Sequence, residues 1–220
     1  MIAIDTRTIT QAILNQWSPV SWDEFLRLVD EPTNNGLKGY YYNGRMRLEA
    51  MSTGSDHSND HHILIFLISL FATLQGIPLR GKDACSYRKT GISEFQPDAS
   101  YYLGDRVDAV PRGVRVIDLD LYPLPDLVIE ISDTSLSDDQ GQKRLQYEDL
   151  RIAEYWILDI QNSRLLAFAI TEDHGSRQIR KSLVLPNLDL DLIQEALQRS
   201  RSQDQSTIGA WWMAQLAAKS

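Results

Sequence analysis

The chain has 220 residues, 43% hydrophobic and 24% charged, which is enough for one sizeable α/β domain of ordinary globular composition. Its 22 basic and 30 acidic residues give a formal net charge of −8, which disfavours broad, non-specific binding to nucleic acid. The single cysteine, Cys85, excludes an internal disulfide and a thiolate metal cluster.

Two features of the sequence bear on localisation. The longest strongly apolar stretch, residues 63–74, is too short to cross a bilayer and is interrupted by Ser69 and Thr73. The first residues lack the basic, apolar and cleavage regions of a secretory signal. We therefore expect a cytoplasmic protein with no membrane partner.

The N-terminal part predicts one helix and one hairpin. Ser21 and Glu24 form a capping box, because the hydroxyl can accept from the first free amides and the acid lies three residues on. The helix that they open is expected to end near Asp30. Residues 40–48 are typical of a β-hairpin that turns at Asn43-Gly44.

The middle of the chain predicts a long helix, two strands and a loop. A helix is expected over residues 57–75, because its apolar residues recur at intervals of three and four. Short strands are expected near residues 79–88 and 94–102, joined by Thr90-Gly91, and residues 104–124 are expected to form an irregular loop or hairpin.

The C-terminal half predicts alternating strands and helices. Asp138-Asp139 can cap a helix over about residues 140–151, with Leu145 and Leu150 pointing inward. The other expected elements are strands at residues 127–131, 155–158, 165–170 and 178–183, a helix at 190–199, a polar linker at 200–206 and a helix at 208–218. This order predicts a mixed α/β (α+β) fold with one sheet flanked by helices. We expect a single domain over residues 1–200, followed by a linker and short helix over residues 201–220.

Two acidic residues stand out as candidate metal ligands. Residues 127–131 are apolar on both faces, as in a central strand, except for Glu130 in their midst. A desolvated carboxylate is costly unless it has a partner or a cation. Asp98 follows Pro97 and opens a strand-like segment, so it is either a metal ligand or a turn residue. Two converging carboxylates favour a divalent metal ion.

Lys143 and His57 are further candidates for the same site. Lys143 lies near the start of the helix after Glu130, where an ammonium does not favour the helix dipole. It is either a site residue that stabilises developing negative charge or a surface lysine beside Asp139. His57 and His61 share one helix face, a spacing found in zinc sites, but no third ligand is evident. A zinc hydrolase is therefore the weakest interpretation, and His57 could instead line the cleft with Asp98 and Glu130.

In order, these segments resemble a known family. The resemblance rests on Leu48-Glu49-Ala50-Met51-Ser52 with His57, Pro97-Asp98, Pro125-Asp126-Leu127-Val128-Ile129-Glu130-Ile131-Ser132, Lys143 with Tyr147, and Glu154-Tyr155-Trp156-Ile157-Leu158-Asp159. Over roughly residues 20–190 the chain resembles the restriction-endonuclease-like nuclease family that is abundant in cyanobacteria and belongs to the PD-(D/E)xK superfamily.

The resemblance implies a restriction-endonuclease-like αβββαβ core in which Asp98 and Glu130 bind Mg²⁺ or Mn²⁺. The superfamily's lysine usually lies two residues beyond the second acid, where this chain has Ser132. In such families the next helix commonly supplies it, which indicates Lys143. Glu49 and His57 match family positions near the cleft. The implied activity is endonucleolytic hydrolysis of phosphodiester bonds in nucleic acid, with DNA as the expected substrate.

One alternative belongs to a different functional class. The chain could be a non-catalytic assembly or regulatory module that keeps the nuclease fold, which the acidic net charge and an exposed-looking Trp211-Trp212 helix favour. A homodimer is compatible with either hypothesis, because Trp211, Trp212 and Met213 suit a protein contact. A measurement of divalent metal binding would distinguish the two hypotheses, because only the nuclease requires the ion.

Overall fold

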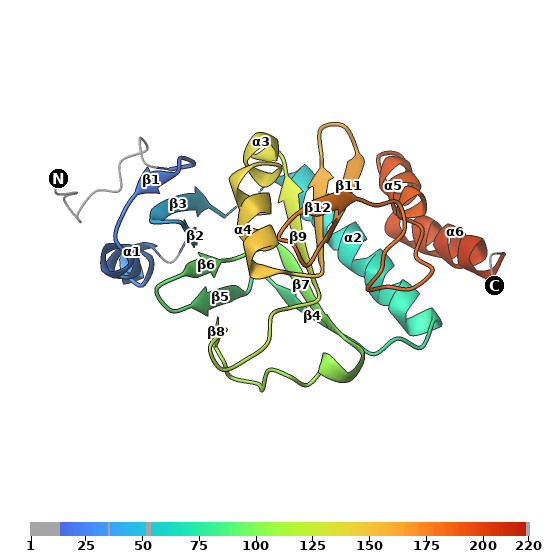
Figure 1. Cartoon of the computed structure of the whole chain (residues 1–220). Helices are drawn as coiled ribbons and strands as arrows, with labels where there is room; N and C mark the ends of the chain where they lie inside the picture. Colours follow the sequence, from blue (N-terminus) through green and yellow to red (C-terminus); the bar gives the residue numbers. More distant parts are fainter. Residues whose placement is uncertain (1–13, 35, 52–53, 219–220) are drawn as a thin grey trace. The chain divides into compact units, whose positions relative to one another are not determined.

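The computed structural model describes residues 14–34, 36–51 and 54–218. The chain divides into two compact units: a smaller one made of Met1–Ser52, Ser86–Gln96 and Val114–Tyr122, and a larger one made of Thr53–Cys85, Pro97–Gly113 and Pro123–Ser220. Each unit contains a six-stranded mixed sheet (Figure 1). The mixed α/β fold is thus confirmed, with two sheets where we predicted one.

The larger unit is built on a sheet with the strand order β12-β11-β10-β9-β7-β4. Its strands are β4 (Leu79–Asp83), β7 (Ala99–Leu103), β9 (Leu127–Ser132), β10 (Glu154–Asp159), β11 (Arg164–Ile170) and β12 (Ser176–Gln178). The β9–β10 pair is parallel and the other pairs are antiparallel. As predicted, β9 is central, with β10 on one side and β7 on the other.

Helices of the larger unit cover this sheet. They are α2 (Ser55–Leu74), α3 (Leu136–Asp139), α4 (Gln142–Leu150), α5 (Leu190–Arg199) and α6 (Gln205–Ala217), with a short 3₁₀ turn η2 (Gly104–Arg106). Leu127, Ile129 and Ile131 of β9 join the core that α2, α5 and α6 share. Because side chains alternate along a strand, Glu130 points to the opposite face, where Tyr147 of α4 contacts it.

The smaller unit contains the predicted N-terminal helix and hairpin. Its elements are β1 (Ser18–Pro19), α1 (Trp22–Val29), η1 (Pro32–Asn34), β2 (Leu37–Tyr42), β3 (Arg45–Ala50), β5 (Ser86–Lys89), β6 (Ser93–Phe95) and β8 (Val116–Asp118). The Ser21 half of the capping box is confirmed, since its hydroxyl accepts from the Glu24 amide at 3.3 Å, whereas the Glu24 carboxylate pairs with Arg27. The hairpin turn is confirmed too, because Asn43 and Gly44 both have positive φ, as a tight hairpin turn requires.

Two predicted strands were wrong in extent, because each is divided between the sheets. Residues 79–88 form β4 of the larger sheet and β5 of the smaller one, with Ala84 at φ 45° between them. Residues 94–102 form parts of β6 and β7, interrupted at Pro97, which has no N–H to donate to a ladder.

The predicted helix over residues 140–151 was also partly wrong. Asp138 and Asp139 belong to a separate short helix, α3, and Gly141 precedes α4 without a side-chain cap. Leu145 does not point inward, since it is 42% exposed. Lys143, Gln146 and Tyr147 are buried in its place. The inward face of α4 is therefore polar, which an apolar pattern cannot reveal.

The C-terminal elements mostly follow the prediction. The helix α5 begins and ends as expected, whereas the strand predicted at residues 178–183 is reduced to β12 and an isolated bridge between Lys181 and Asp189. The expected exposure of Trp212 was wrong, because this side chain is fully buried in the core of the larger unit. Trp211 is half-buried beneath the Arg199 guanidinium, 4.5 Å from the ring centroid. No helix in the described part of the chain is long and apolar enough to span a bilayer.

Candidate active site

Asp98 lies at the end of β7 nearest the centre of β9. The register pairs Ala99 with Ile129, so one further step places Asp98 opposite Glu130. Residues directly opposite each other in an antiparallel pair have neighbouring side chains. The Asp98 carboxylate is buried, and its Oδ2 accepts a hydrogen bond from the Ile131 amide at 2.7 Å. Asp98 is thereby held against the strand that carries Glu130.

Glu130 occupies the middle of the central strand and is only 2% exposed. The Tyr147 hydroxyl donates to its Oε1 at 2.7 Å, and the Lys143 Nζ lies 3.8 Å from its Oε2. Both partners come from α4, four residues apart, which places them on one face of the helix. The buried carboxylate therefore has a hydrogen-bond donor and a cation supplied by the same helix.

Lys143 is among the most deeply buried charged groups of the larger unit, with 1% of its surface exposed. Its Nζ lies 3.0 Å from Asp139 Oδ1 and 3.8 Å from Glu130 Oε2. The surface-lysine interpretation of Lys143 is therefore wrong. Asp139 is fully buried, and Tyr155 donates to its backbone carbonyl at 3.0 Å. Burial and the nearby Asp139 and Glu130 carboxylates raise the pKa of Tyr155 well above its ordinary value, so the phenol stays a donor.

His57 joins this group from the first turn of α2. Its side chain is buried, and its Nε2 lies 3.7 Å from Asp98 Oδ1. His61, one turn later, has its Nε2 3.5 Å from Asp83 Oδ1. Among the residues that the structure describes, no three His, Cys, Asp or Glu side chains form a metal-binding cluster. A zinc site needs at least three such ligands, whereas Mg²⁺ is usually held by one or two carboxylates and keeps several waters.

The structure thus brings together four of the five residues singled out from the sequence: Asp98, Glu130, Lys143 and His57. The fifth, Glu49, lies on β3 in the smaller unit. There the Arg47 Nε donates to its Oε1 at 2.5 Å, and Lys38 faces it across the β2–β3 ladder.

Two members of the buried group, Asp139 and Tyr147, were not predicted as site residues. Asp139 was interpreted as a helix cap, and Tyr147 was included only through the family resemblance. The signal that could have found them is the spacing of Asp139, Lys143 and Tyr147 at intervals of four residues. On one continuous helix this spacing lines up polar groups, although here α3 and α4 share them.

The charges at the site do not cancel. By formal charge, Asp98, Glu130 and Asp139 count as three negative charges against one positive charge from Lys143, with His57 counted as neutral. All four side chains are buried, so water screens this excess weakly. An excess of two negative charges is what one divalent cation would neutralise.

Glu154 shows how this chain satisfies a buried carboxylate without any cation. It begins β10, is fully buried, and accepts hydrogen bonds from the Ser182 hydroxyl and from the Leu183 and Val184 amides. The Trp156 indole donates to its Oε2 at 2.9 Å. Among the described residues, the hydrogen bonds to Glu154 therefore come from neutral donors, whereas Glu130 has an ammonium beside it.

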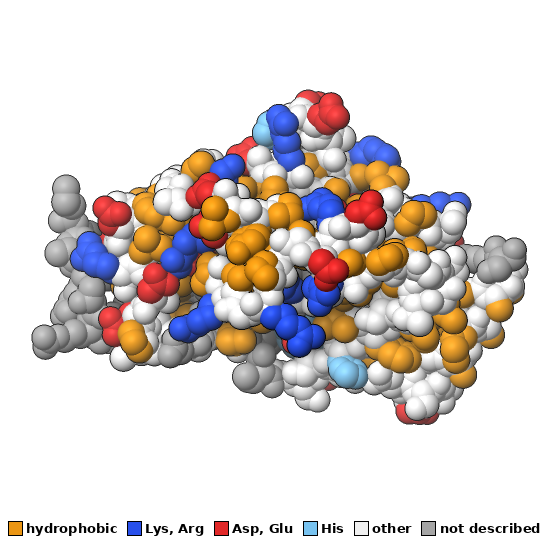
Figure 2. Space-filling model, turned by 90° about the horizontal axis from the view of Figure 1, so that it is seen from below, with side chains coloured by type: hydrophobic (Ala, Val, Ile, Leu, Met, Phe, Trp, Pro, Cys, Tyr) orange, Lys and Arg blue, Asp and Glu red, His pale blue; other side chains and the backbone are white. Residues whose placement is uncertain are grey.

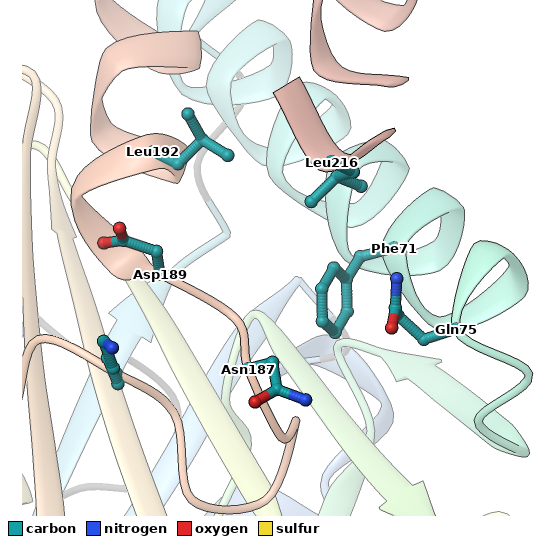
Figure 3. A pocket seen from close by; sticks show the side chains of 7 residues that line it. Phe71, Gln75, Asn187, Asp189, Leu192 and Leu216 are labelled. Atoms are coloured by element: carbon teal, nitrogen blue, oxygen red, sulfur yellow. The ribbon is translucent and has the colours of Figure 1, made fainter. Parts of the chain in front are cut away.

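The larger unit also has a pocket of about 460 Å³, drawn in Figure 3. It is lined by Phe71, Gln75, Lys181, Asn187, Asp189, Leu192 and Leu216. Phe71 and His57 are 14 residues apart on α2, which corresponds to about 21 Å along the helix axis. The pocket is therefore separate from the buried acidic group.

The surface drawn in Figure 2 has Lys and Arg side chains interspersed with acidic and apolar ones, without a continuous basic field. This mixture agrees with the net charge of −8. Any recognition of a polyanion on this face would depend on local groups more than on a general electrostatic field.

Comparison with known proteins gives a family match and a structural match. The model of the Uma2 family, described as putative restriction endonuclease, matches residues 22–202. A crystal structure of a putative nuclease belonging to DUF820 from Anabaena variabilis ATCC 29413 superimposes with a TM-score of 0.54 at 18% sequence identity. The match covers 81% of this chain and 99% of that one, and it shows a shared fold. No curated protein matches the chain.

Proposed function

This chain belongs to the Uma2 putative restriction endonuclease family, and we propose that it is a metal-dependent endonuclease that hydrolyses phosphodiester bonds in DNA. The observation that carries the proposal is the buried group formed by Asp98, Glu130 and Lys143. Two carboxylates and an ammonium within one buried group suit hydrolysis of a phosphodiester.

The residues of the group fit a divalent cation such as Mg²⁺ or Mn²⁺. Asp98 and Glu130 supply the carboxylate oxygens that these ions prefer, and the excess of negative charge matches the charge of one ion. When bound, such an ion would polarise the scissile phosphate and lower the pKa of an attacking water.

The chain's own side chains have distinct tasks in this proposal. Lys143 would donate to the attacking water or to a phosphate oxygen, offsetting negative charge as it develops. Tyr147 holds Glu130 through its hydroxyl, and the Ile131 amide holds Asp98. His57, beside Asp98, would orient that carboxylate from the α2 side.

The test compares two buried glutamates on neighbouring strands. In Glu130→Gln we expect loss of Mn²⁺ binding, measured by calorimetry, and loss of DNA cleavage with Mg²⁺ or Mn²⁺. In Glu154→Gln, the matched control, both should persist in the folded protein, because Glu154 is satisfied by neutral donors. Unchanged cleavage in Glu130→Gln would contradict the assignment. A wild-type protein without divalent affinity would favour a non-catalytic module.

We also propose that two copies of the chain pair. On α6 the Met213 side chain is 44% exposed next to the half-buried Trp211, although the burial of Trp212 reduces the apolar surface first expected there. Light scattering coupled to size-exclusion chromatography gives the oligomeric state directly.

A further inference from the structure

The lysine of the proposed site is connected to Ser132 by a series of polar groups, of which Ser135 is half-buried. Ser132 lies two residues beyond Glu130, at the end of β9. The Ser132 Oγ lies 3.4 Å from the Ser135 Oγ, which donates to Asp139 Oδ2 at 2.6 Å. The other Asp139 oxygen lies 3.0 Å from the Lys143 Nζ. These contacts therefore connect Ser132, at the end of β9, to Lys143 on α4.

Asp139 is fixed at three points. Ser135 contacts one carboxylate oxygen, Lys143 contacts the other, and Tyr155 donates to the backbone carbonyl. The residue is fully buried, and the ring of Tyr155 is packed 4.7 Å from that of Tyr147, centroid to centroid. A carboxylate held in this way has little freedom to move, so its position determines where the lysine ammonium lies.

From this geometry we propose that Asp139 is a positioning residue, which holds the Lys143 ammonium beside Glu130 rather than directly on it. This inference rests on the proposed nuclease function for its catalytic consequence. Asp139 would act through Lys143 and would not itself bind the metal ion or the substrate.

The two distances from Lys143 support this role. Both contacts are ion pairs, and the Nζ is closer to Asp139 Oδ1, at 3.0 Å, than to Glu130 Oε2, at 3.8 Å. Coulombic attraction also increases as separation falls, so Asp139 is the stronger of these two partners. If Asp139 lost its charge, the ammonium would move toward Glu130. A closer ammonium would compete there with a divalent cation for the same carboxylate.

Asp139→Asn tests the inference because it removes the charge and keeps the side chain's shape. In a metal-free crystal structure of the variant we expect the Lys143 Nζ to approach Glu130 to within hydrogen-bond distance. We expect Mn²⁺ affinity, measured by calorimetry, to fall by about 10–100-fold, as for other groups that orient a metal ligand or its partner. In DNA cleavage, kcat should fall by a similar factor with little change in KM. Asp149→Asn, an exposed carboxylate on the same helix as Lys143, is the matched control.

A double-mutant cycle with Lys143→Met separates positioning from a direct role. If Asp139 acts through Lys143, Asp139→Asn should change Mn²⁺ affinity by no more than about twofold when Lys143 is already absent. An equal effect in both backgrounds, or an ammonium that stays in place in Asp139→Asn, would overturn the inference. Should Asp139→Asn not fold, Ser135→Ala removes one anchor and leaves the carboxylate, and a smaller shift of the same kind is expected.

Failure of the nuclease proposal would give a different set of results from failure of this inference. If neither the wild type nor any variant bound Mn²⁺ or cleaved DNA, the nuclease proposal would fail. The position of the Lys143 Nζ in metal-free Asp139→Asn would still decide whether Asp139 positions the lysine.

Discussion

Replacing Lys143 by Met measures how much the buried ammonium stabilises the fold. Met keeps most of the aliphatic stem and removes the charge, which leaves Asp139 and Glu130 buried without their common cation. At an effective dielectric constant of about 20, separations of 3.0 and 3.8 Å correspond to attractions of about 5.5 and 4.4 kcal/mol. The cost of burying the ammonium opposes much of this attraction.

We therefore expect Lys143→Met to lower the free energy of unfolding by about 3–5 kcal/mol, the range for a buried ion pair that loses one partner. The assay is denaturation by urea at pH 7 with a chelator, so that no divalent ion is present. Lys181→Met is the control, because Lys181 is exposed and its loss should cost no more than about 0.5 kcal/mol.

Divalent ions should reverse part of this loss. In Lys143→Met the ammonium beside Glu130 is gone, so a Mn²⁺ ion held by Asp98 and Glu130 has more negative charge to neutralise than in the wild type. At a free concentration of 100 times Kd, binding stabilises a folded protein by about 2.7 kcal/mol. A variant as stable as the wild type in chelator would refute the view that Lys143 is a buried counter-ion. Stability that Mn²⁺ does not change would refute the cation site.

Two further predictions concern buried acids outside the site. Glu154→Gln should lower the free energy of unfolding by about 2–3 kcal/mol in urea denaturation, because the amide group replaces an ionised acceptor of several hydrogen bonds; an unchanged stability would contradict this account. Burial raises the pKa of Asp60 above its ordinary value of 3.8, although Arg201 opposes the shift. The folded chain thus binds this proton at higher pH than the unfolded chain, so the stabilising contribution is present below 3.8 and is lost as pH rises through the raised pKa. Relative to Asp60→Asn, the wild type should gain stability as pH falls from 7 toward 4, and a change in the opposite direction would contradict the shift.

The local elements were predictable where neighbouring residues decide them. The Ser21 cap depends on Glu24 three residues away, and the hairpin depends on two turn residues that tolerate positive φ. The bounds of α5 followed from periodicity and its flanking residues. Each of these signals lies within a few positions of the element that it specifies.

The partition of strands between two sheets was not predictable in this way. At Ala84 and Pro97, each segment predicted as one strand is divided, and its two parts belong to different sheets. Pairing partners lie far away in sequence, as β4 pairs with β7 and β5 pairs with β8. An apolar pattern states that a residue is buried, but not which sheet buries it.

The sequence by itself determined the fold class and singled out Glu130, since a carboxylate within an apolar run is conspicuous without coordinates. Only the tertiary structure decided that Lys143 is buried and that Asp139 is its nearer partner. The reason is that burial of a polar helix face depends on charges from elsewhere in the fold. Lys143 and Tyr147 turn inward because β9 presents Glu130 to them, and nothing in the helix's own residues requires that orientation.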